Sequence, residues 1–427
     1  MRSNKREIIE NPAIGETCTK ITHSSGLEIY AVKKDFSSYY AIFGTRYGSF
    51  DNTLITKNGE KTEVPEGIAH FLEHKLFESE EGTDAFEDFS AAGADANAFT
   101  STDMTAYLFS CTDEFYTSLE TLIKMVLTPH FTPENVAKEQ GIIGQEIKMC
   151  EDRPSDALHY NLMKALYKKN PIRIPIAGTV ESIAMITPEL LYDCYKSYYR
   201  MSNMTLCLCG NIDVDKVEEI VNSLIPEKNE GKVVFTECKE DAECNQKLIK
   251  ANMDVAKPLF KIGIKFPEGT PENDAACAVL SETLFGESED FYSSLYEDGL
   301  ISSYSNYYDC SRSAAHFVFG GDSDDPSEVF DRFIAYADKI KKNGVSDEAI
   351  ERSKRVLYAE ALRGYDSTEN VVMNLFESFI TGVDCLKRAE KYTSVTSDEV
   401  NALIPLVLDE KRFAMSAVYP LTEKEDC

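Results

Sequence analysis

The chain has 427 residues, more than one hydrophobic core usually organises, so we expect two domains of about 200 residues each. Its 44 Lys and Arg against 73 Asp and Glu give a formal net charge of −29, which argues against nucleic acid or an anionic membrane as a partner. The first residues lack a secretory signal, no apolar run approaches about 18 residues, and the 12 Cys contain no Cys-x-x-Cys pair, so the sequence predicts a reduced, soluble, cytoplasmic protein.

In the first half of the chain, predicted strands alternate with predicted helices. Apolar runs typical of strands occupy residues 27–33, 39–47, 93–101 (after an initial turn), 104–111 and 204–210, and a polar loop fills 48–63. Helical apolar spacing predicts helices that begin near Pro65 and at 84–92, 115–127, 133–149, 187–199 and 214–224. Cys207 and Cys209 share one face of their strand, and we expect them to be small buried side chains rather than a metal or disulfide site.

A second set of elements follows the first in the same order. Residues 227–247 are rich in Lys, Glu, Asp and Gly and form the predicted linker between a first domain, 1–226, and a second, 248–427. Beyond the linker, the strand at 260–266 matches that at 39–47, the helix at 275–285 matches the one near Pro65, and 346–361 matches 132–147. We therefore expect two copies of one α+β unit.

The most informative motif is His70-Phe-Leu-Glu73-His74. Residues four apart lie one turn apart on one face of a helix, so both imidazoles can reach one metal ion, with Glu73 on the same side. The order inverts the commoner His-Glu-x-x-His and is a metallopeptidase signature in its own right. The alternative is a coincidence on an amphipathic helix. With only 6 His in the chain, two at this spacing beside a Glu favour the metal.

The second copy lacks this motif. When the two copies are aligned, Ala278, Ser281 and Glu282 stand where the first copy has its two His and its Glu. We therefore expect metal binding in the first copy alone.

A third protein ligand is expected on the predicted helix at 133–149. Glu139 and Glu146 are seven residues apart, so both carboxylates lie on one face of this helix and can point towards the metal. Glu146 stands between Ile143 and Ile147, where an unpaired carboxylate would need the compensation that Zn²⁺ supplies. Spacing alone leaves open whether Glu139 belongs to the site or is a solvated helix charge.

Four blocks of sequence follow one another in a fixed order. They are His-Phe-Leu-Glu-His-Lys-Leu-Phe at 70–77, Gly-Ala-Asp-Ala-Asn-Ala-Phe-Thr-Ser-Thr-Asp-Met-Thr-Ala-Tyr at 93–107, Glu-x6-Glu-Ile at 139–147 and Ile-Ala-Gly-Thr-Val-Glu-Ser-Ile-Ala-Met-Ile-Thr-Pro at 176–188. Together they resemble the pitrilysin/insulinase family of inverzincin zinc peptidases over essentially the whole chain. The chain has the size of the half-length, processing-peptidase-like branch, in which two two-domain subunits enclose a chamber. The resemblance implies two homologous α+β domains, each a mostly antiparallel sheet covered by helices, as in the LuxS/MPP-like metalloprotease fold.

The resemblance also implies a role for each site residue. His70, His74 and Glu146 would bind Zn²⁺, and Glu73 would be the general base that activates water. Glu139 would orient a ligand His and fix its tautomer.

The resemblance further implies an edge strand that binds substrate. Asn97, Ala98 and Phe99 would lie on it and pair with the backbone of an extended peptide. An ordinary covered edge strand is the alternative.

One block departs from the family pattern. Active members carry an Arg and a Tyr near a Leu-Arg-x-Lys-Gly-Leu-x-Tyr block, which hold the substrate carbonyl and stabilise the oxyanion. Here residues 295–304 place Tyr296 in the position of the Arg and Ser302 in that of the Tyr, with Tyr304 two residues beyond. A second family subunit in a heterodimer would then supply the Arg and Tyr. The alternative is a homodimer in which Tyr304 and Arg312 serve through local rearrangement.

The sequence thus predicts a zinc endopeptidase subunit that hydrolyses short unfolded peptides in a closed chamber, as the metal-bearing half of a heterodimer. The rival interpretation is a non-catalytic scaffold or peptide-binding subunit of the same fold. The complete set of ligands and base favours the enzyme, because scaffold copies usually lose them, as the second copy has.

Overall fold

The computed structural model describes residues 4–55, 61–80, 82, 84–236 and 238–421, which divide into two units by their internal contacts. Unit 1 contains residues 1–147, 175–236 and 362–387, and unit 2 contains 148–174, 237–361 and 388–427. The division differs from a single cut at the predicted linker because two segments, 148–174 and 362–387, belong to the unit built mainly from the other half of the chain. No helix in the described part of the chain has the length and hydropathy needed to cross a bilayer.

A seven-stranded sheet forms the centre of unit 1. Its strand order is β1-β2-β3-β9-β4-β8-β7, and neighbouring strands are antiparallel except β3 and β9. β7 therefore lies at one edge of the sheet. The strands are β1 (Lys5–Asn11), β2 (Glu16–Thr22), β3 (Glu28–Lys33), β4 (Tyr39–Thr45), β7 (Asp95–Thr100), β8 (Thr105–Cys111) and β9 (Met204–Gly210), with a separate pair β5 (Thr53–Ile55) and β6 (Lys61–Glu63).

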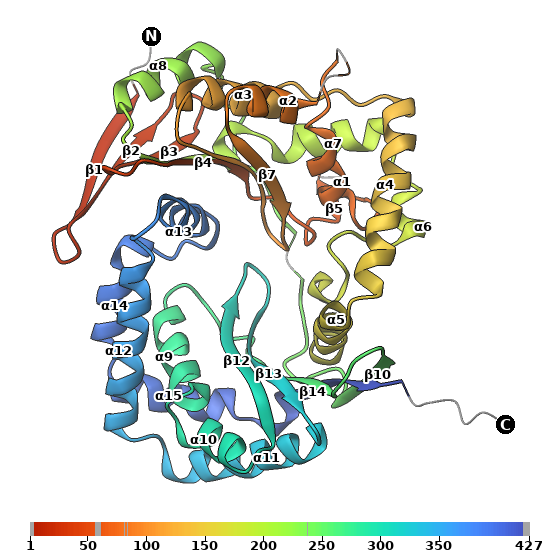
Figure 1. Ribbon diagram of the computed structural model, residues 1–427, viewed down its shortest axis with the longest axis vertical. Coiled ribbons are helices and arrows are strands. Elements are labelled where there is room, and N and C mark those ends of the chain that lie inside the picture. The colour runs from red at the N-terminus through yellow and green to blue at the C-terminus, as the bar shows by residue number, and fades with distance from the viewer. Residues whose placement is uncertain (1–3, 56–60, 81, 83, 237, 422–427) are drawn as a thin grey trace. The chain divides into compact units, whose positions relative to one another are not determined.

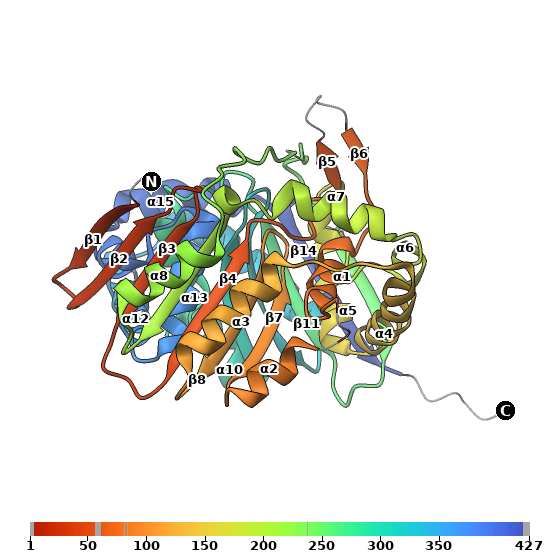
Figure 2. The ribbon, with the colours of Figure 1, turned by 90° about the horizontal axis from the view of Figure 1, so that it is seen from above.

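Helices cover both faces of this sheet. The core on one face joins the sheet to α1, α3, α7 and α8, and Figure 2 shows α3 and α8 lying across that face. The opposite face presents Val32, Ile42, Cys207 and Cys209 to α13, so the two thiols are buried on one face as expected. The helices of unit 1 are α1 (Ile68–Lys75), α2 (Ala85–Ala91), α3 (Phe115–Leu127), α4 (Pro133–Glu151, which ends in unit 2), α6 (Val180–Ile183), α7 (Pro188–Tyr198), α8 (Val214–Leu224) and α13 (Thr368–Thr381).

Unit 2 repeats this plan with a five-stranded sheet. Its order, β10-β14-β11-β13-β12, corresponds strand by strand to β3-β9-β4-β8-β7, and the first pair is again the parallel one. The strands are β10 (Leu248–Met253), β11 (Leu259–Lys265), β12 (Ile301–Cys310), β13 (Ala315–Ser323) and β14 (Phe413–Pro420). The helices are α5 (Pro154–Leu166), α9 (Asp274–Phe285), α10 (Asp290–Glu297), α11 (Pro326–Asn343), α12 (Asp347–Arg363), α14 (Arg388–Ser394) and α15 (Ser397–Val407).

The two halves of the chain exchange one helix each. α5, from the first half, packs on β14 and β11 of unit 2, while α13, from the second half, packs on β9 and β4 of unit 1 (Figure 1). A glycine lies under each exchanged helix. A Cβ on Gly44 would stand 2.4 Å from Cζ of Phe376, and one on Gly263 would stand 2.8 Å from Cδ1 of Leu166. The missing side chains therefore let both helices approach their sheets closely.

The prediction of two α+β domains with mostly antiparallel sheets covered by helices is confirmed. The observed α3 and α8 have the predicted bounds, but α1 begins at Ile68 rather than near Pro65, because a turn closed by Ile68 N–H on the Pro65 carbonyl comes first. The predicted polar loop at 48–63 contains the β5–β6 pair, while its residues 56–60 lie outside the described residues. β1 and β2 were not predicted because the side chains of β1 are mostly exposed and lack a regular apolar alternation.

Candidate metal centre

The helix α1 presents both imidazoles and one carboxylate on a single face. Its Ile68, Phe71 and Leu72 are buried in the core of unit 1, which fixes the rotation of the helix. His70 and His74 lie one turn apart on the other side, with their ring centroids 4.6 Å from each other.

The third side chain comes from α4. Glu146 Oε1 lies 3.6 Å from His70 Nε2, and its Oε2 lies 3.6 Å from His74 Nε2. Glu139, two turns earlier on the same helix, has Oε1 at 3.1 Å from His74 Nδ1. The seven-residue spacing therefore brings both carboxylates of α4 to α1, the helix that carries His70 and His74. Glu139 is buried and hydrogen-bonded rather than a solvated charge.

The donor set fits a zinc ion. Ligand atoms of His70, His74 and Glu146 all lie within 4.8 Å of one another, and this is the one such group of three in the described part of the chain. Around a tetrahedral Zn²⁺ with bonds near 2.0–2.1 Å, ligand atoms stand about 3.4 Å apart, so the two 3.6 Å separations need only a small adjustment. Two imidazoles and one carboxylate leave a fourth position open, as catalytic zinc sites require.

The surroundings of the imidazoles set their protonation. Burial lowers the pKa of His70 to about 3, with the nearby His74 charge acting in the same direction, so its ring is neutral and able to bind metal. Burial also tends to lower the pKa of His74, but its hydrogen bond to Glu139 and the charges of Glu73 and Glu146 outweigh burial and raise it. The contact from Glu139 to Nδ1 directs Nε2 of His74 towards Glu146.

Glu73 lies beside the cluster without belonging to it. The residue is 7% exposed, and its Oε2 accepts a hydrogen bond of 2.6 Å from Oγ1 of Thr100, the last residue of β7. Burial raises the pKa of Glu73 to about 6, although the hydrogen bond from Thr100 and the His74 charge oppose this rise. A carboxylate with this pKa is suited to accept a proton near neutral pH.

A cavity of about 410 Å³ opens next to the cluster of His70, His74 and Glu146. Glu73 and His74 line one side of it, and Asn97 and Ala98 of the edge strand β7 line another. Alternation along β7 turns Ala98 towards the core that contains α1, whereas the Phe99 ring lies edge-on against Phe376 of α13, 6.4 Å between centroids. Of the three residues predicted to bind substrate, two therefore border the cavity and the third packs on the opposite face of the sheet.

The corresponding helix of unit 2 carries no metal cluster in the described residues. The helix α9 carries Ala278, Ser281 and Glu282. Along the chain it follows β11 and precedes β12, just as α1 follows β4 and precedes β7. Tyr304 packs inside unit 2, with its ring 5.2 Å from that of Tyr292. Among the described residues, the first copy of the repeat is thus the one that brings metal-binding side chains together.

Two further residues of the site were not predicted from the sequence. Thr100 binds Glu73, and Lys75, directly after His74, places its ammonium 3.4 Å from Oε2 of Glu139. A signal for Lys75 exists in the sequence, since a lysine that follows a metal-binding histidine on a buried helix needs a carboxylate partner.

Known proteins are similar to this chain in both sequence and fold. Residues 54–180 match the protein family described as "Insulinase (Peptidase family M16)", and residues 185–357 match the one described as "Peptidase M16 inactive domain". The chain is 36% identical over 430 residues to the uncharacterized zinc protease YmfH of Bacillus subtilis, covering 96% of this chain and 99% of that one. It is 26% identical over 325 residues to the uncharacterized zinc protease YmxG of the same organism, covering 73% and 78%.

Solved structures agree with these matches. The crystal structure of an M16-like peptidase from Alicyclobacillus acidocaldarius has a TM-score of 0.90 and 32% identity, covering 97% of this chain and 100% of that one. A protease from Helicobacter pylori has a TM-score of 0.80 over 98% of this chain and 100% of that one, and at 17% identity it shows the fold alone. Since the match to YmfH spans nearly the full length of both chains, as the sequence motifs led us to expect, the chain belongs to the M16 insulinase family of peptidases.

Proposed function

We propose that this chain is the zinc-binding subunit of an endopeptidase that hydrolyses short unfolded peptides. The observation that carries the proposal is the convergence of His70, His74 and Glu146 within 4.8 Å of one another, with the carboxylate of Glu73 beside them. The names of the relatives, which call them zinc proteases, support the same chemistry.

Each residue has a distinct task in this proposal. His70, His74 and Glu146 would hold Zn²⁺, which as a Lewis acid polarises a carbonyl oxygen and acidifies water. Glu73 accepts a proton from the attacking water and delivers it to the leaving amine. Glu139 holds the ring of His74, so that Nε2 remains the free nitrogen.

The edge of the sheet is proposed to bind the substrate backbone. β7 is the last strand of its sheet, so its outer backbone groups can pair with an extended peptide. Asn97 and Ala98 on this strand border the cavity that contains Glu73 and His74, which would bring a scissile bond to the base. Recognition through the backbone requires an extended, hence unfolded, segment of substrate.

The proposal includes a partner subunit and a compartment. Tyr296 replaces the expected Arg and Tyr304 packs within unit 2, which favours a second family member that supplies the Arg and Tyr over a homodimer. No disulfide joins the described cysteines, which is the state that a reducing compartment such as the cytoplasm maintains, and we propose that the reaction takes place there.

Metal content and peptide cleavage test this function together. The purified chain should contain about one zinc per molecule, and His74→Ala should lose it. His130→Ala is the matched control, because His130 lies in unit 1 outside the cluster and should leave zinc bound. A His74→Ala protein with full zinc would refute the assignment of the site. A zinc-loaded chain that binds peptides but cleaves none, with or without its partner, would instead support the scaffold interpretation.

A further inference from the structure

Lys75 is a fully buried lysine next to a metal-binding histidine. Its side chain is 0% exposed, and its Nζ donates to the carboxylates of Glu78 and Glu139, the second at 3.4 Å from Oε2. A buried ammonium is expensive to desolvate and persists only where carboxylates compensate it. An apolar side chain would fill the same space at lower cost, so the ammonium here calls for an explanation beyond packing.

Glu139 uses both of its oxygens on consecutive residues of α1. Oε1 faces Nδ1 of His74 at 3.1 Å, and Oε2 accepts from Lys75. A carboxylate held at one oxygen can rotate about its terminal torsion, whereas one held at both cannot. The contact from Lys75 thus fixes the plane of Glu139 and, through it, the ring of His74.

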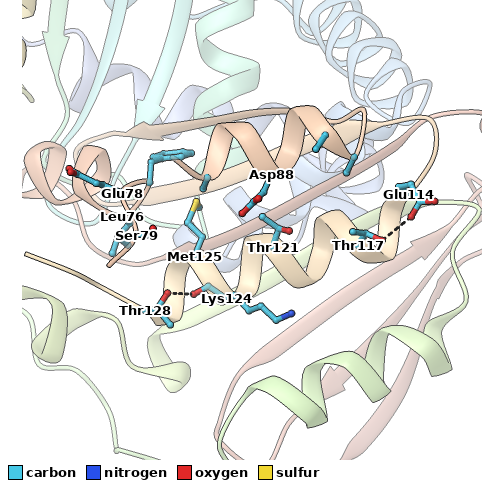
Figure 3. A pocket seen from close by; sticks show the side chains of 14 residues that line it. Leu76, Glu78, Ser79, Asp88, Glu114, Thr117, Thr121, Lys124, Met125 and Thr128 are labelled. Atoms are coloured by element: carbon cyan, nitrogen blue, oxygen red, sulfur yellow. Dashed lines mark hydrogen bonds between the residues drawn. The ribbon is translucent and has the colours of Figure 1, made fainter. Parts of the chain in front are cut away.

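The other end of this arrangement is anchored at the surface of unit 1. Glu78, which accepts from Lys75, lines both the 410 Å³ cavity beside the metal cluster and a groove of about 720 Å³ between α2 and α3. Figure 3 shows Glu78 at one end of this groove, beyond Asp88 of α2 and Met125 of α3. Glu78 is partly exposed while Lys75 is not, so the ion pair connects a solvent-facing carboxylate to the buried one at the metal helix.

We propose that Lys75 is a positioning residue of the metal centre. It acts through Glu139 to hold His74 in the orientation and tautomer that bind metal, while its own side chain, at the wall of the 410 Å³ cavity, is 0% exposed and is not one of the three proposed metal-binding residues. The inference rests on the proposed function, because it assigns Lys75 a task in the zinc site of that peptidase.

The alternative is that Lys75 only stabilises the fold, and unit 2 offers a matched case. Lys265 is 1% exposed, and its Nζ lies 3.2 Å from Oε1 of Glu240, far in sequence from any metal-binding side chain. Lys75→Met and Lys265→Met therefore remove the same kind of buried ion pair. A structural role predicts that both variants lower the melting temperature and that neither changes metal binding.

The experiment measures zinc affinity by chelator competition and the visible absorption spectrum of the Co²⁺-loaded protein. We expect Lys75→Met to bind zinc about 10-fold more weakly and to alter the Co²⁺ spectrum, as loss of a group that orients a ligand does. Lys265→Met should match the wild-type protein in both measurements. If Lys75→Met does not fold, Lys75→Gln, which keeps a polar group but no charge, should show the same changes.

A double variant tests the path through Glu139. If Lys75 acts only through this carboxylate, Lys75→Met combined with Glu139→Gln should bind zinc no more weakly than Glu139→Gln alone. Losses that multiply, or a folded Lys75→Met protein with wild-type affinity and spectrum, would overturn the inference. A wild-type chain that binds zinc but cleaves no peptide would refute the proposed function and leave the role of Lys75 to be decided by the metal measurements.

Discussion

Thr100 donates its hydroxyl to Glu73 at 2.6 Å and so joins the edge strand β7 to the helix that carries both imidazoles. The strand proposed to hold the substrate is thus bonded to the carboxylate proposed to act on it. The side chain of Thr100 would set the position of a peptide bound at this edge relative to Glu73, because Thr100 and Ala98 lie two residues apart on the same face of the strand.

Removing this hydroxyl should shift the pH dependence of cleavage. Thr100→Val keeps the branched shape but deletes the hydrogen bond that lowers the pKa of Glu73, so this pKa should rise. Because the base must be ionised, activity rises with pH through this pKa, and the acid limb of kcat/KM should move to higher pH while zinc stays bound. Thr205→Val is the control, since its hydroxyl donates to the Glu28 carbonyl oxygen away from the site. An unchanged acid limb in Thr100→Val would contradict the prediction that this hydrogen bond lowers the pKa of the base.

Replacing the proposed base, Glu73, should separate metal binding from catalysis. Glu73→Gln keeps the shape of the side chain and leaves all three metal-binding residues in place, so zinc content should stay at about one per chain. Loss of a general base typically costs about 10²–10⁴-fold in rate, and we expect kcat to fall within this range. Paired metal analysis and turnover of a fluorogenic peptide check the prediction, and undiminished turnover would refute the mechanism.

Zinc binding should release protons in a pH-dependent way. In the metal-free protein the hydrogen bond to Glu139 and the nearby carboxylates raise the pKa of His74 in spite of its burial, so zinc must displace a proton from more of these rings than from ordinary histidines at the same pH. Affinity should therefore weaken as pH falls through this raised pKa, whereas His70, with a pKa of about 3, is already neutral. Calorimetry in buffers of different ionisation enthalpy counts the protons. Glu139→Gln removes one cause of the raised pKa and should release fewer of them at the same pH.

The isolated chain should be a poor peptidase. If a partner supplies the Arg and Tyr that stabilise the oxyanion, their absence costs about 10²–10³-fold in rate. Adding a family member that lacks His-x-x-Glu-His but keeps Arg and Tyr should restore cleavage, and genes adjacent to this one are the place to look for it. Full activity of the chain alone would defeat the heterodimer. If Tyr304→Phe or Arg312→Ala then abolished that activity, the homodimer would be supported.

The exchanged helix α13 should be essential to the stability of unit 1. Phe376 is fully buried and lies against Gly44 of β4, so Phe376→Ala should lower the free energy of unfolding by about 3–5 kcal/mol. Denaturant unfolding followed by circular dichroism measures this loss. A loss below about 1 kcal/mol would mean that the helix contributes little to the core.

The sequence predicted what local periodicity can determine. Helical spacing placed both imidazoles and Glu73 on one face of α1, and the seven-residue interval placed Glu139 and Glu146 on one face of α4. Whether Glu139 meets His74 or solvent depends on how α4 packs against α1, which no periodicity reports. The family resemblance implied that Glu139 orients a ligand histidine, but the spacing of the residues did not predict the contact between Glu139 and His74.

Other parts of the site and fold depend on tertiary contacts alone. Thr100 follows no pattern that distinguishes it from neighbouring polar residues, because its partner Glu73 lies 27 residues away on another element. The contact between Lys75 and Glu139 likewise depends on how α4 packs against α1. The destination of α5 and α13 was likewise not predicted. An apolar stripe shows that a helix buries one face, but it does not say which of two similar sheets will cover that face.

The exchange of α5 and α13 also governs how the protein can be made. About 130 residues lie between the end of the main body of unit 1 at Thr236 and the start of α13 at Thr368, which takes a ribosome roughly 6–26 s to translate. During this interval one apolar face of the first sheet has no cover, so the nascent chain is a natural client for chaperones. A gene divided at residues 227–247 would yield two fragments that each expose a sheet and carry the helix belonging to the other, and they should become soluble only when produced together.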